Sequence, residues 1–395
     1  MNTPIRYVII ALVLIITLHS ILTITHDEYS RVTSLSNLIS QSNNGSSSSA
    51  TIDIHTEPPI SISSPDVAKE ELSHKTSKAM ANATFVILAH NDDLDGTIQS
   101  MREMEDRFNR KHGYPWVLLN EVPFTPEFIK RISIITTAPI EFGIIPYDHW
   151  YQPNWVDEAK AKAKASRDKM KADGIIYRGG YRNMCRFNSG VLQFFYRHKL
   201  LQKYWYYWRV KPNVHFHCEI DFDPFLFMER EKKTYGFTIT MYEFEATIKT
   251  LWSAVKEFVT QHPQYVAPNN ALGFLTEDGG DTYNLCHFWS NFEIADMDFW
   301  HAEAYATFFN YLDLRGGFYY ERWGDAPVHS IAVALFTPRD QLHFFNDIGY
   351  EHPPYTHCPR GDNIWSKGRC ACDLKKSFDY DGYSCMTKWD RLMNN

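Results

Sequence analysis

The chain lacks the features by which several large functional classes are recognised. It has no basic excess, because 40 Lys and Arg stand against 47 Asp and Glu and the formal charge is 40 − 47 = −7. Nucleic-acid-binding proteins usually carry such an excess, so this class is excluded. The polar stretch 157–172 is accordingly interpreted as a solvated surface helix rather than a basic binding face. There is no internal repeat, G-x-G-x-x-G motif or P-loop, so a dinucleotide-binding fold has no support.

A second deficit is confined to the first 80 residues. They contain no Cys and no Trp, and their only aromatic residues are Tyr7 and Tyr29, although the whole chain is 15% aromatic. We therefore place the globular part in residues 81–395. The full length allows two or three domains of about 100 to 200 residues, or one large α/β unit with appendages.

The uncharged segment 7–24 predicts a signal-anchor transmembrane helix. Its length, at about 1.5 Å per residue, nearly matches a hydrocarbon core of roughly 30 Å. Arg6 precedes it, so residues 1–6 are expected to be a cytoplasmic tail. The Ser/Pro-rich residues 27–80 would form a lumenal stem. A cleaved signal peptide is the alternative, and both interpretations place the chain in the secretory pathway.

All seven cysteines lie in the globular part, and four of them fall in the last 38 residues. In an oxidising lumen these four predict two disulfides that pin the C-terminal tail. A zinc site with help from His357 is the alternative. The odd total leaves at least one thiol unpaired or intermolecular. The seven are Cys185, Cys218, Cys286, Cys358, Cys370, Cys372 and Cys385.

The start of the globular part has a β-α-β pattern. A short apolar run at 84–89 predicts a strand, and apolar residues at helical spacing over 94–108 predict an amphipathic helix. The segment 116–120 predicts a second buried strand, so we expect a parallel sheet. Ligands of open α/β sheets bind at the carboxyl ends of the strands. The polar turn that begins at His90 is therefore a candidate nucleotide contact.

Alternating residues over 214–225 predict a half-buried strand whose polar face ends in Glu219, Asp221 and Asp223. Closely placed carboxylates can hold a divalent cation, which in turn neutralises a diphosphate. Many nucleotide-sugar transferases use a D-x-D motif after a strand for this purpose. The alternative is a solvated strand face.

Two later stretches are dense in polar and aromatic groups. The segment 282–300 surrounds Glu293 with aromatic residues that could face a sugar, as could the aromatic residues of 204–209. The segment 316–336 sets Glu321, Arg322, Asp325 and His329 directly before an apolar run. An ordinary core with satisfied polar groups is the alternative, but their joint occurrence favours a site.

A series of long motifs in fixed order resembles one family. The chain is similar to the fungal Golgi α-1,2-mannosyltransferases of the KRE2/MNT1 family, glycosyltransferase family 15, over approximately residues 83–386. The motifs are YRNMCRFNSG (181–190), YYWRVKP (206–212), YGFTI (235–239), YNLCHFWSNFEIA (283–295), GGFYYERWGDAPVHSIAVALF (316–336) and DIGYEHPPYTHCP (347–359).

The resemblance implies a GT-A-like α/β fold with a mixed central sheet. It implies a retaining enzyme that uses manganese and transfers mannose from GDP-mannose to mannose-terminated O- or N-linked glycans of glycoproteins. It also implies a type II protein of the Golgi membrane with a lumenal catalytic domain, able to associate with other mannosyltransferases.

The resemblance also implies roles for single residues. Glu293 matches the carboxylate proposed as nucleophile or as stabiliser of the transition state, and Tyr181 matches a tyrosine of the active site. His329 matches a metal-binding histidine. Substrate contacts are expected from Arg209, Lys211, Asn291, Asp325 and His90.

Lys211 is a departure from the family, which reads YWRVEP where this chain reads YYWRVKP. The family's Glu is the metal ligand, and a protonated lysine has no lone pair to offer a metal. Three outcomes are open. Glu219, Asp221 or Asp223 could hold the metal with His329, the Lys211 ammonium could itself neutralise the diphosphate, or the protein could be an impaired homologue kept for binding or assembly.

Two smaller departures concern the family's strand-end Arg-Asn, which is His90-Asn91 here, and the segment 188–198, which is three residues longer. Two other classes remain as alternatives to a transferase. A glycoside hydrolase could use Glu293 with Asp325, provided that the two carboxyls lie about 5 to 9.5 Å apart. A lumenal mannan-binding lectin would bind glycan without consuming a donor.

Overall fold

The computed structural model describes residues 80–162, 179–190 and 195–394. The predicted tail, anchor and stem fall in residues 1–79, outside the described part. Part of the polar stretch 157–172 and of the long segment 188–198 also falls outside it. Among the described residues, no helix has the length and apolar character needed to cross a membrane.

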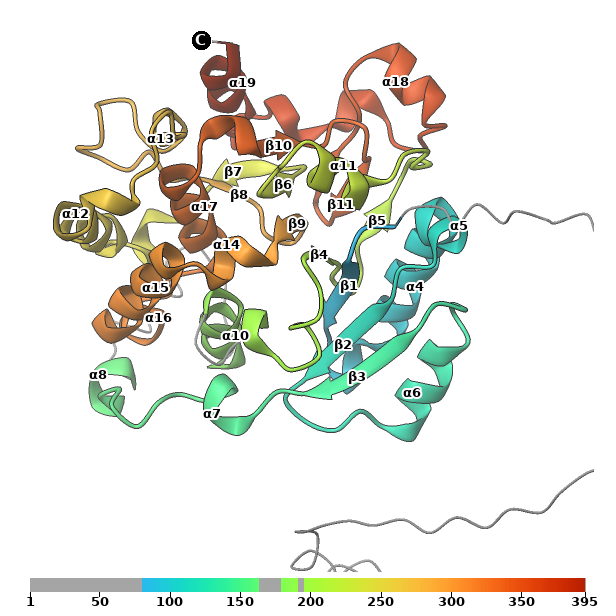
Figure 1. The fold of residues 1–395 in the computed structure, drawn as a ribbon, viewed down its shortest axis with the longest axis horizontal. Coiled ribbons are helices and arrows are strands. Elements are labelled where there is room, and N and C mark those ends of the chain that lie inside the picture. Colours follow the sequence, from blue (N-terminus) through green and yellow to red (C-terminus); the bar gives the residue numbers. More distant parts are fainter. Residues whose placement is uncertain (1–79, 163–178, 191–194, 395) are drawn as a thin grey trace, which may run out of the picture. The chain divides into compact units, whose positions relative to one another are not determined.

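A mixed sheet of seven strands organises the described chain, in the order β10-β6-β9-β4-β1-β2-β3 (Figure 1). Strands β3, β2, β1 and β4 run parallel to one another, as do β6 and β10, whereas β9 lies between these two groups and is antiparallel to β4 and β6. The α/β class with a mixed sheet is confirmed. The strands are β1 (Ala83–Leu88), β2 (Trp116–Asn120), β3 (Ile140–Ile144), β4 (Tyr206–Arg209), β6 (Tyr235–Phe237), β9 (Glu293–Asp296) and β10 (Leu342–Phe344).

The predicted β-α-β unit is present. Strands β1 and β2 pair in parallel, and α4 (Leu94–Met104) connects them, extended by the π-helix η2 (Glu105–Asn109) and by α5 (Arg110–His112). Helix α6 (Pro126–Ser133) follows β2, and Thr125 caps it, because its hydroxyl accepts a hydrogen bond from the Phe128 amide.

Side chains alternate between two hydrophobic cores, one on each face of the sheet. In β1, Phe85 and Ile87 pack with residues of α4 and α6, whereas Val86 packs on the opposite face. That opposite face is covered by α10 (Gly179–Ser189), α12 (Leu251–Gln261), α15 (Glu303–Arg315) and α17 (Asp325–Phe336). Helix α17 is buried over almost its whole length, which explains its continuous apolar run.

Shorter elements complete the described part. Helices α7 (Tyr147–Trp150), α8 (Glu158–Lys162), α11 (Pro224–Arg230), α13 (Leu272–Leu275), α14 (Met297–His301), α16 (Gly317–Tyr320), α18 (Asp362–Lys367) and α19 (Met386–Asn394) lie between or after the strands. Strands β5 (His215–Phe216), β11 (Tyr350–His352) and β12 (Tyr355–His357) form one small sheet, and β7 (Thr240–Tyr242) and β8 (Cys286–Phe288) form another.

The prediction of a strand over 214–225 was wrong. Only His215 and Phe216 pair as a strand, and the chain then runs irregularly to α11. Asp223 is the N-cap of that helix, and its carboxylate accepts hydrogen bonds from the Phe225 and Leu226 amides. The alternation that suggested a strand reflects a coil with every second side chain buried.

The four tail cysteines take part in three disulfides rather than the predicted two, because two of them pair with earlier cysteines. Two bridges connect the tail to earlier segments, Cys218–Cys370 and Cys286–Cys385, and Cys358–Cys372 lies within the tail. The leftover thiol is the buried Cys185. Since all four tail cysteines are in these bridges, the alternative of a zinc site with His357 does not hold.

Candidate active site

The antiparallel direction of β9 assembles the site. Strand β4 ends at Arg209, and Arg209 pairs in register with Glu293, the first residue of β9. Because the two strands run in opposite directions, the end of one meets the beginning of the other at the same edge of the sheet. Two residues from distant motifs thereby become neighbours, with 3.9 Å between Arg209 Nη1 and Glu293 Oε1.

Asp325, the first residue of α17, lies against the same arginine. Arg209 Nη1 donates to its Oδ2 at 2.7 Å, Ser290 Oγ donates at 3.1 Å, and Asn188 Nδ2 donates at 3.4 Å. Burial alone would raise the pKa of Asp325, but the charge of Arg209 holds that pKa below its usual range. The carboxylate is therefore ionised at physiological pH.

Glu293 is more enclosed than Asp325, with 1% of its surface exposed. Its Oε1 accepts from the Tyr207 hydroxyl at 2.8 Å, and its Oε2 accepts from the Tyr235 hydroxyl at 3.1 Å. Burial raises the pKa of both tyrosines well above the usual value, so both remain neutral donors.

His329 completes this network. Its Nδ1 lies 3.1 Å from Glu293 Oε2, and its Nε2 lies 2.8 Å from the Tyr196 hydroxyl and 3.1 Å from the Asn188 carbonyl oxygen. The ring is fully buried. Both ring nitrogens have protein partners, so His329 holds Glu293 in place. Its role as a metal ligand stays a prediction.

Two adjoining cavities open beside this network. The first, of about 300 Å³, is lined by Tyr181, Asn291 and Asp325, among other residues. The second, of about 210 Å³, is lined by His90 and Arg209, among others. Lys211 and Met184 line both, so the two form one cleft at the carboxyl ends of β1 and β4. Open α/β sheets place their ligands at this edge.

Lys211 stands where the two cavities meet. Its Nζ donates to Asn291 Oδ1 at 3.0 Å. Burial lowers the pKa of Lys211 to about 8, and the neighbouring Arg209 charge contributes to this shift. His90, on the second cavity, pairs with Glu121 at 3.1 Å, and this hydrogen bond raises the pKa of the imidazole.

Several other cleft residues come from the quoted motifs, whereas Glu243 lies outside all of them. Glu243 and Arg322 form a buried ion pair of 3.3 Å on the wall of the first cavity. Trp289 and Tyr355 form an aromatic wall there, with 5.5 Å between their ring centroids. His352 lies against Trp289, and burial, with the Lys211 charge, lowers its pKa to about 4.

The aromatic residues of 204–209 contribute less to the cleft than the sequence suggested. Tyr207 and Trp208 are fully buried in β4. They belong to the core, and the aromatic wall of the cleft comes from Trp289 and Tyr355 instead.

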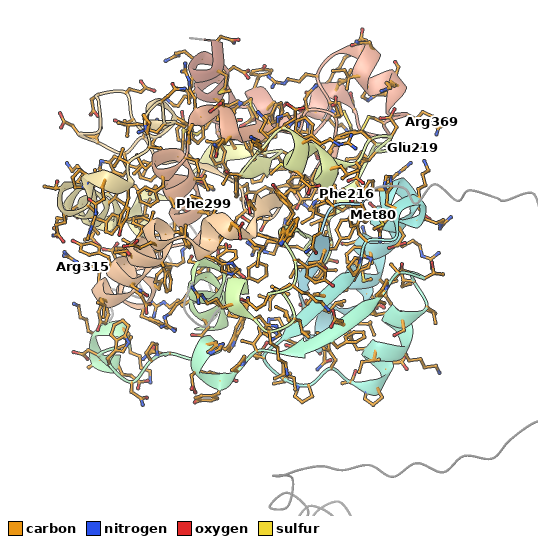
Figure 2. All side chains as sticks on the ribbon, viewed as in Figure 1. Met80, Phe216, Glu219, Phe299, Arg315 and Arg369 are labelled. Carbon is orange, nitrogen blue, oxygen red and sulfur yellow. A yellow bond between two sulfur atoms is a disulfide. The ribbon has the colours of Figure 1, made fainter. Side chains whose placement is uncertain are left out.

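The three acidic residues of 219–223 lie away from this cleft. Glu219 forms an ion pair with Arg369, and Figure 2 shows the two side by side at the rim of the molecule. Asp221 pairs with Lys367 at 3.0 Å. Asp223 is engaged as the helix cap described above. Each of the three has another partner and His329 is enclosed, so a metal ion shared between one of them and His329 stays a prediction that no contact among the described residues supports.

The cleft residues do not fit a manganese ion. Three carboxylates line the two cavities, and each already has a protein partner: Asp325 with Arg209, Glu243 with Arg322, and Asp93 with the His90 amide. The described residues contain no group of three His, Cys, Asp or Glu arranged to hold a metal ion. Arg209 and Lys211 instead offer a pair of cations, which suits an anion.

Comparison with known proteins identifies the family. The family model described as "Glycolipid 2-alpha-mannosyltransferase" matches residues 36–394. The chain is 50% identical over 313 residues to glycolipid 2-alpha-mannosyltransferase 2 of Candida albicans, covering 79% of this chain and 67% of that one. It is 50% identical over 310 residues to the O-glycoside alpha-1,2-mannosyltransferase omh1 of Schizosaccharomyces pombe, covering 78% of each.

Two solved structures share the fold. One is the mannosyltransferase Ktr4p of S. cerevisiae in complex with GDP, with a TM-score of 0.74, 41% identity, and coverage of 79% of this chain and 82% of that one. The other is core-mannan synthase A of Aspergillus fumigatus in a Mn/GDP form, with a TM-score of 0.73, 39% identity, and coverage of 80% and 86%.

Proposed function

Because the chain belongs to the glycolipid 2-alpha-mannosyltransferase family, glycosyltransferase family 15, we propose that it transfers mannose from GDP-mannose, with retention, to mannose-terminated O- or N-linked glycans of glycoproteins. The observation that carries the proposal is the cationic cleft of Arg209 and Lys211 at the carboxyl ends of β1 and β4. A relative of the same fold binds GDP. The same proposal includes the assignment of the fold to the GT-A-like class.

The cleft residues have distinct tasks in this reaction. The bond between mannose and diphosphate breaks, its electron pair goes to the diphosphate oxygen, and Arg209 and Lys211 stabilise the negative charge. The ionised Asp325 on the cavity wall stabilises positive charge at the anomeric carbon, and Glu293 holds Arg209 from behind. The acceptor hydroxyl forms the new carbon–oxygen bond and passes its proton to the departing diphosphate. Tyr181, on the wall of the first cavity, orients the sugar.

We assign the protein to the Golgi membrane as a single-pass type II protein with its catalytic part in the lumen. The uncharged segment 7–24 and the Ser/Pro-rich residues 27–80 support this assignment. The three disulfides also agree with an oxidising compartment. Other mannosyltransferases of that membrane are its proposed partners.

The transferase proposal is tested by GDP release. Purified full-length protein is incubated with GDP-mannose and α-methyl mannoside, with manganese or with chelator, and the disaccharide product is analysed for its anomeric configuration. We expect GDP release that depends on the acceptor and an α-linked product. No release under either condition would contradict the proposal, and a β-linked product would contradict retention.

A second function, binding of donor and glycan without transfer, is favoured by one observation, the presence of Lys211 where the family has a glutamate. A family member that has lost the metal-binding carboxylate could bind donor and glycan without transfer and serve in complex assembly. Such a protein would bind GDP-mannose and mannoside in calorimetry and yet release no GDP.

A further inference from the structure

Lys211 lies where its positive charge can contact a ligand in either cavity of the cleft. It follows the end of β4 by two residues and lines both cavities. Arg209, which lines the second cavity, has its Nη1 bonded to Asp325, so most of its charge is already balanced. The Lys211 side chain, by contrast, faces the neutral amide of Asn291.

The hydrogen-bond capacity of Lys211 leaves room for an anion. An ammonium group has three N–H donors. Within the described part of the chain, Nζ makes one hydrogen bond, to Asn291 Oδ1. A diphosphate in the cleft would supply the acceptors for the other donors and the charge that the asparagine lacks.

The surroundings of Lys211 argue against a purely structural role. A structural lysine in a partly buried place is usually paired with a carboxylate, because an unpaired buried charge is costly. Here Nζ is hydrogen-bonded to the neutral Asn291. Repulsion by the Arg209 charge lowers the Lys211 pKa by more than attraction from Asp325 or from Asp93 raises it. The protein therefore keeps two like charges together at a cavity wall, an arrangement that an anionic ligand would stabilise.

We propose that the Lys211 ammonium takes the place of a divalent cation in this protein, binding the diphosphate of the donor so that nucleotide binding and transfer need no metal ion. This inference rests on the proposed function for the identity of the nucleotide. It resolves the misfit between the cleft residues and a manganese ion. It also separates this chain from the A. fumigatus relative, whose structure holds manganese together with GDP.

The test is GDP binding by titration calorimetry, in chelator and in manganese, with four variants of the full chain. Wild type should bind GDP equally well in both conditions. Lys211→Met should lose about tenfold or more of the affinity in both, because a charge-assisted hydrogen bond is lost. Lys211→Arg should stay within about threefold of wild type. Lys211→Glu should bind weakly in chelator and recover at least tenfold in manganese.

The fourth variant, Lys367→Met, is the matched control. It removes one positive charge from an exposed ion pair with Asp221, away from the cleft, and should bind GDP as wild type does. Melting temperatures of all variants identify any that fail to fold, in which case Lys211→Arg and wild type still decide the metal dependence.

Two results would overturn the inference: a wild-type affinity for GDP that rises tenfold or more on adding manganese, or a folded Lys211→Met variant that binds GDP like wild type in chelator. Binding without transfer would reject the proposed function and leave the metal-free site standing. A folded protein that binds no GDP in either condition would reject both.

Discussion

Asp325 and Glu293 lie side by side at the edge where β4 meets β9, but only Asp325 lines the cavity. The change Asp325→Asn should lower kcat for GDP release by about a hundredfold or more, because it removes the carboxylate charge that we propose stabilises the anomeric carbon. Steady-state kinetics with α-methyl mannoside measure it. A variant that keeps its melting temperature and most of its kcat would show that Asp325 serves only to hold Arg209.

Glu293→Gln tests the other carboxylate. Its oxygens accept from Tyr207, Tyr235 and His329, and an amide in their place leaves one of these donors facing another donor. We expect a loss of about 1–3 kcal/mol in the free energy of unfolding, the usual cost of an unsatisfied buried polar group. Denaturant unfolding measures it. Loss of turnover without any loss of stability would instead favour the nucleophile role that the family motif implies.

Lys211 gives the cleft a pH dependence that can be measured. Its pKa is about 8, so the ammonium loses its proton as the pH rises, and GDP affinity should fall by up to about tenfold per pH unit above 8. Titration calorimetry from pH 7 to 9.5 measures the fall. Lys211→Arg stays charged throughout and should show no such fall, so an equal decline in both variants would contradict the prediction.

No other group facing Lys211 should titrate in this range. Arg209 and Asp325 stay charged, His352 has its pKa lowered to about 4 and stays neutral, and burial raises the pKa of the Cys185 thiol well above its usual value. Arg209, Asp325, Asp93 and Cys185 act on the Lys211 pKa, and Lys211 in turn acts on that of His352.

Most cleft residues could be predicted from the sequence, but their arrangement in space could not. Lys211, Asp325 and Tyr181 were named from motifs and line the cleft. Glu293 and His329 also came from motifs, yet they lie behind the wall, because burial depends on how β9 and α17 pack and not on the local pattern. Arg322 was named from its motif, but its partner Glu243 and the contact of His352 with Trp289 had no spacing signal, since these contacts join segments that are distant in the chain.

At the scale of helices and strands, the periodicity of apolar residues predicted an element correctly where that element packs in the same way along its whole length. Strands β1 and β2 and helix α4 lie where the apolar pattern placed them. The segment 214–225 failed because alternate burial also occurs in a coil that crosses a core, and the N-cap at Asp223 is a helix signal within it. Strand pairings between distant segments, such as β9 with β4, carry no local signature.

The change Asp223→Ala tests whether Asp223 caps α11 or binds a metal ion. Asp223→Ala should cost about 0.5–2 kcal/mol in unfolding free energy, the usual loss when a helix cap is removed, with GDP affinity unchanged. Its pKa is lowered, through hydrogen bonds from His112 and the α11 amides that outweigh burial, so the stabilisation is present near neutral pH and is lost in acid. Denaturant unfolding at pH 7 and pH 3 measures the stability loss and its pH dependence, and titration calorimetry measures the affinities for GDP and manganese. An altered manganese affinity would revive the metal interpretation.

At the scale of the whole molecule, the disulfides connect the C-terminal tail to the cleft. Cys286–Cys385 spans 99 residues and anchors β8, after which the chain passes directly to Trp289 and Asn291 on the cleft wall. Cys358–Cys372 spans 14 residues and stays within the tail. The tail therefore contributes to the cleft through this bridge and through Tyr383, which lines the first cavity, although none of its cysteines lines either cavity.

Removing each bridge as a pair of serines should separate the two contributions. A longer closed loop restricts the unfolded chain more, so Cys286→Ser with Cys385→Ser should cost about 1–2 kcal/mol more than Cys358→Ser with Cys372→Ser. Because β8 also positions Trp289 and Asn291, the first pair should raise KM for the acceptor, and the second should leave KM near wild type. Denaturant unfolding without reductant and steady-state kinetics measure the two effects. Equal stability losses with equal KM values would mean that the cleft wall holds its shape without the bridge, and that the pairing of β8 with β7 and its packing against α17 are enough to hold it.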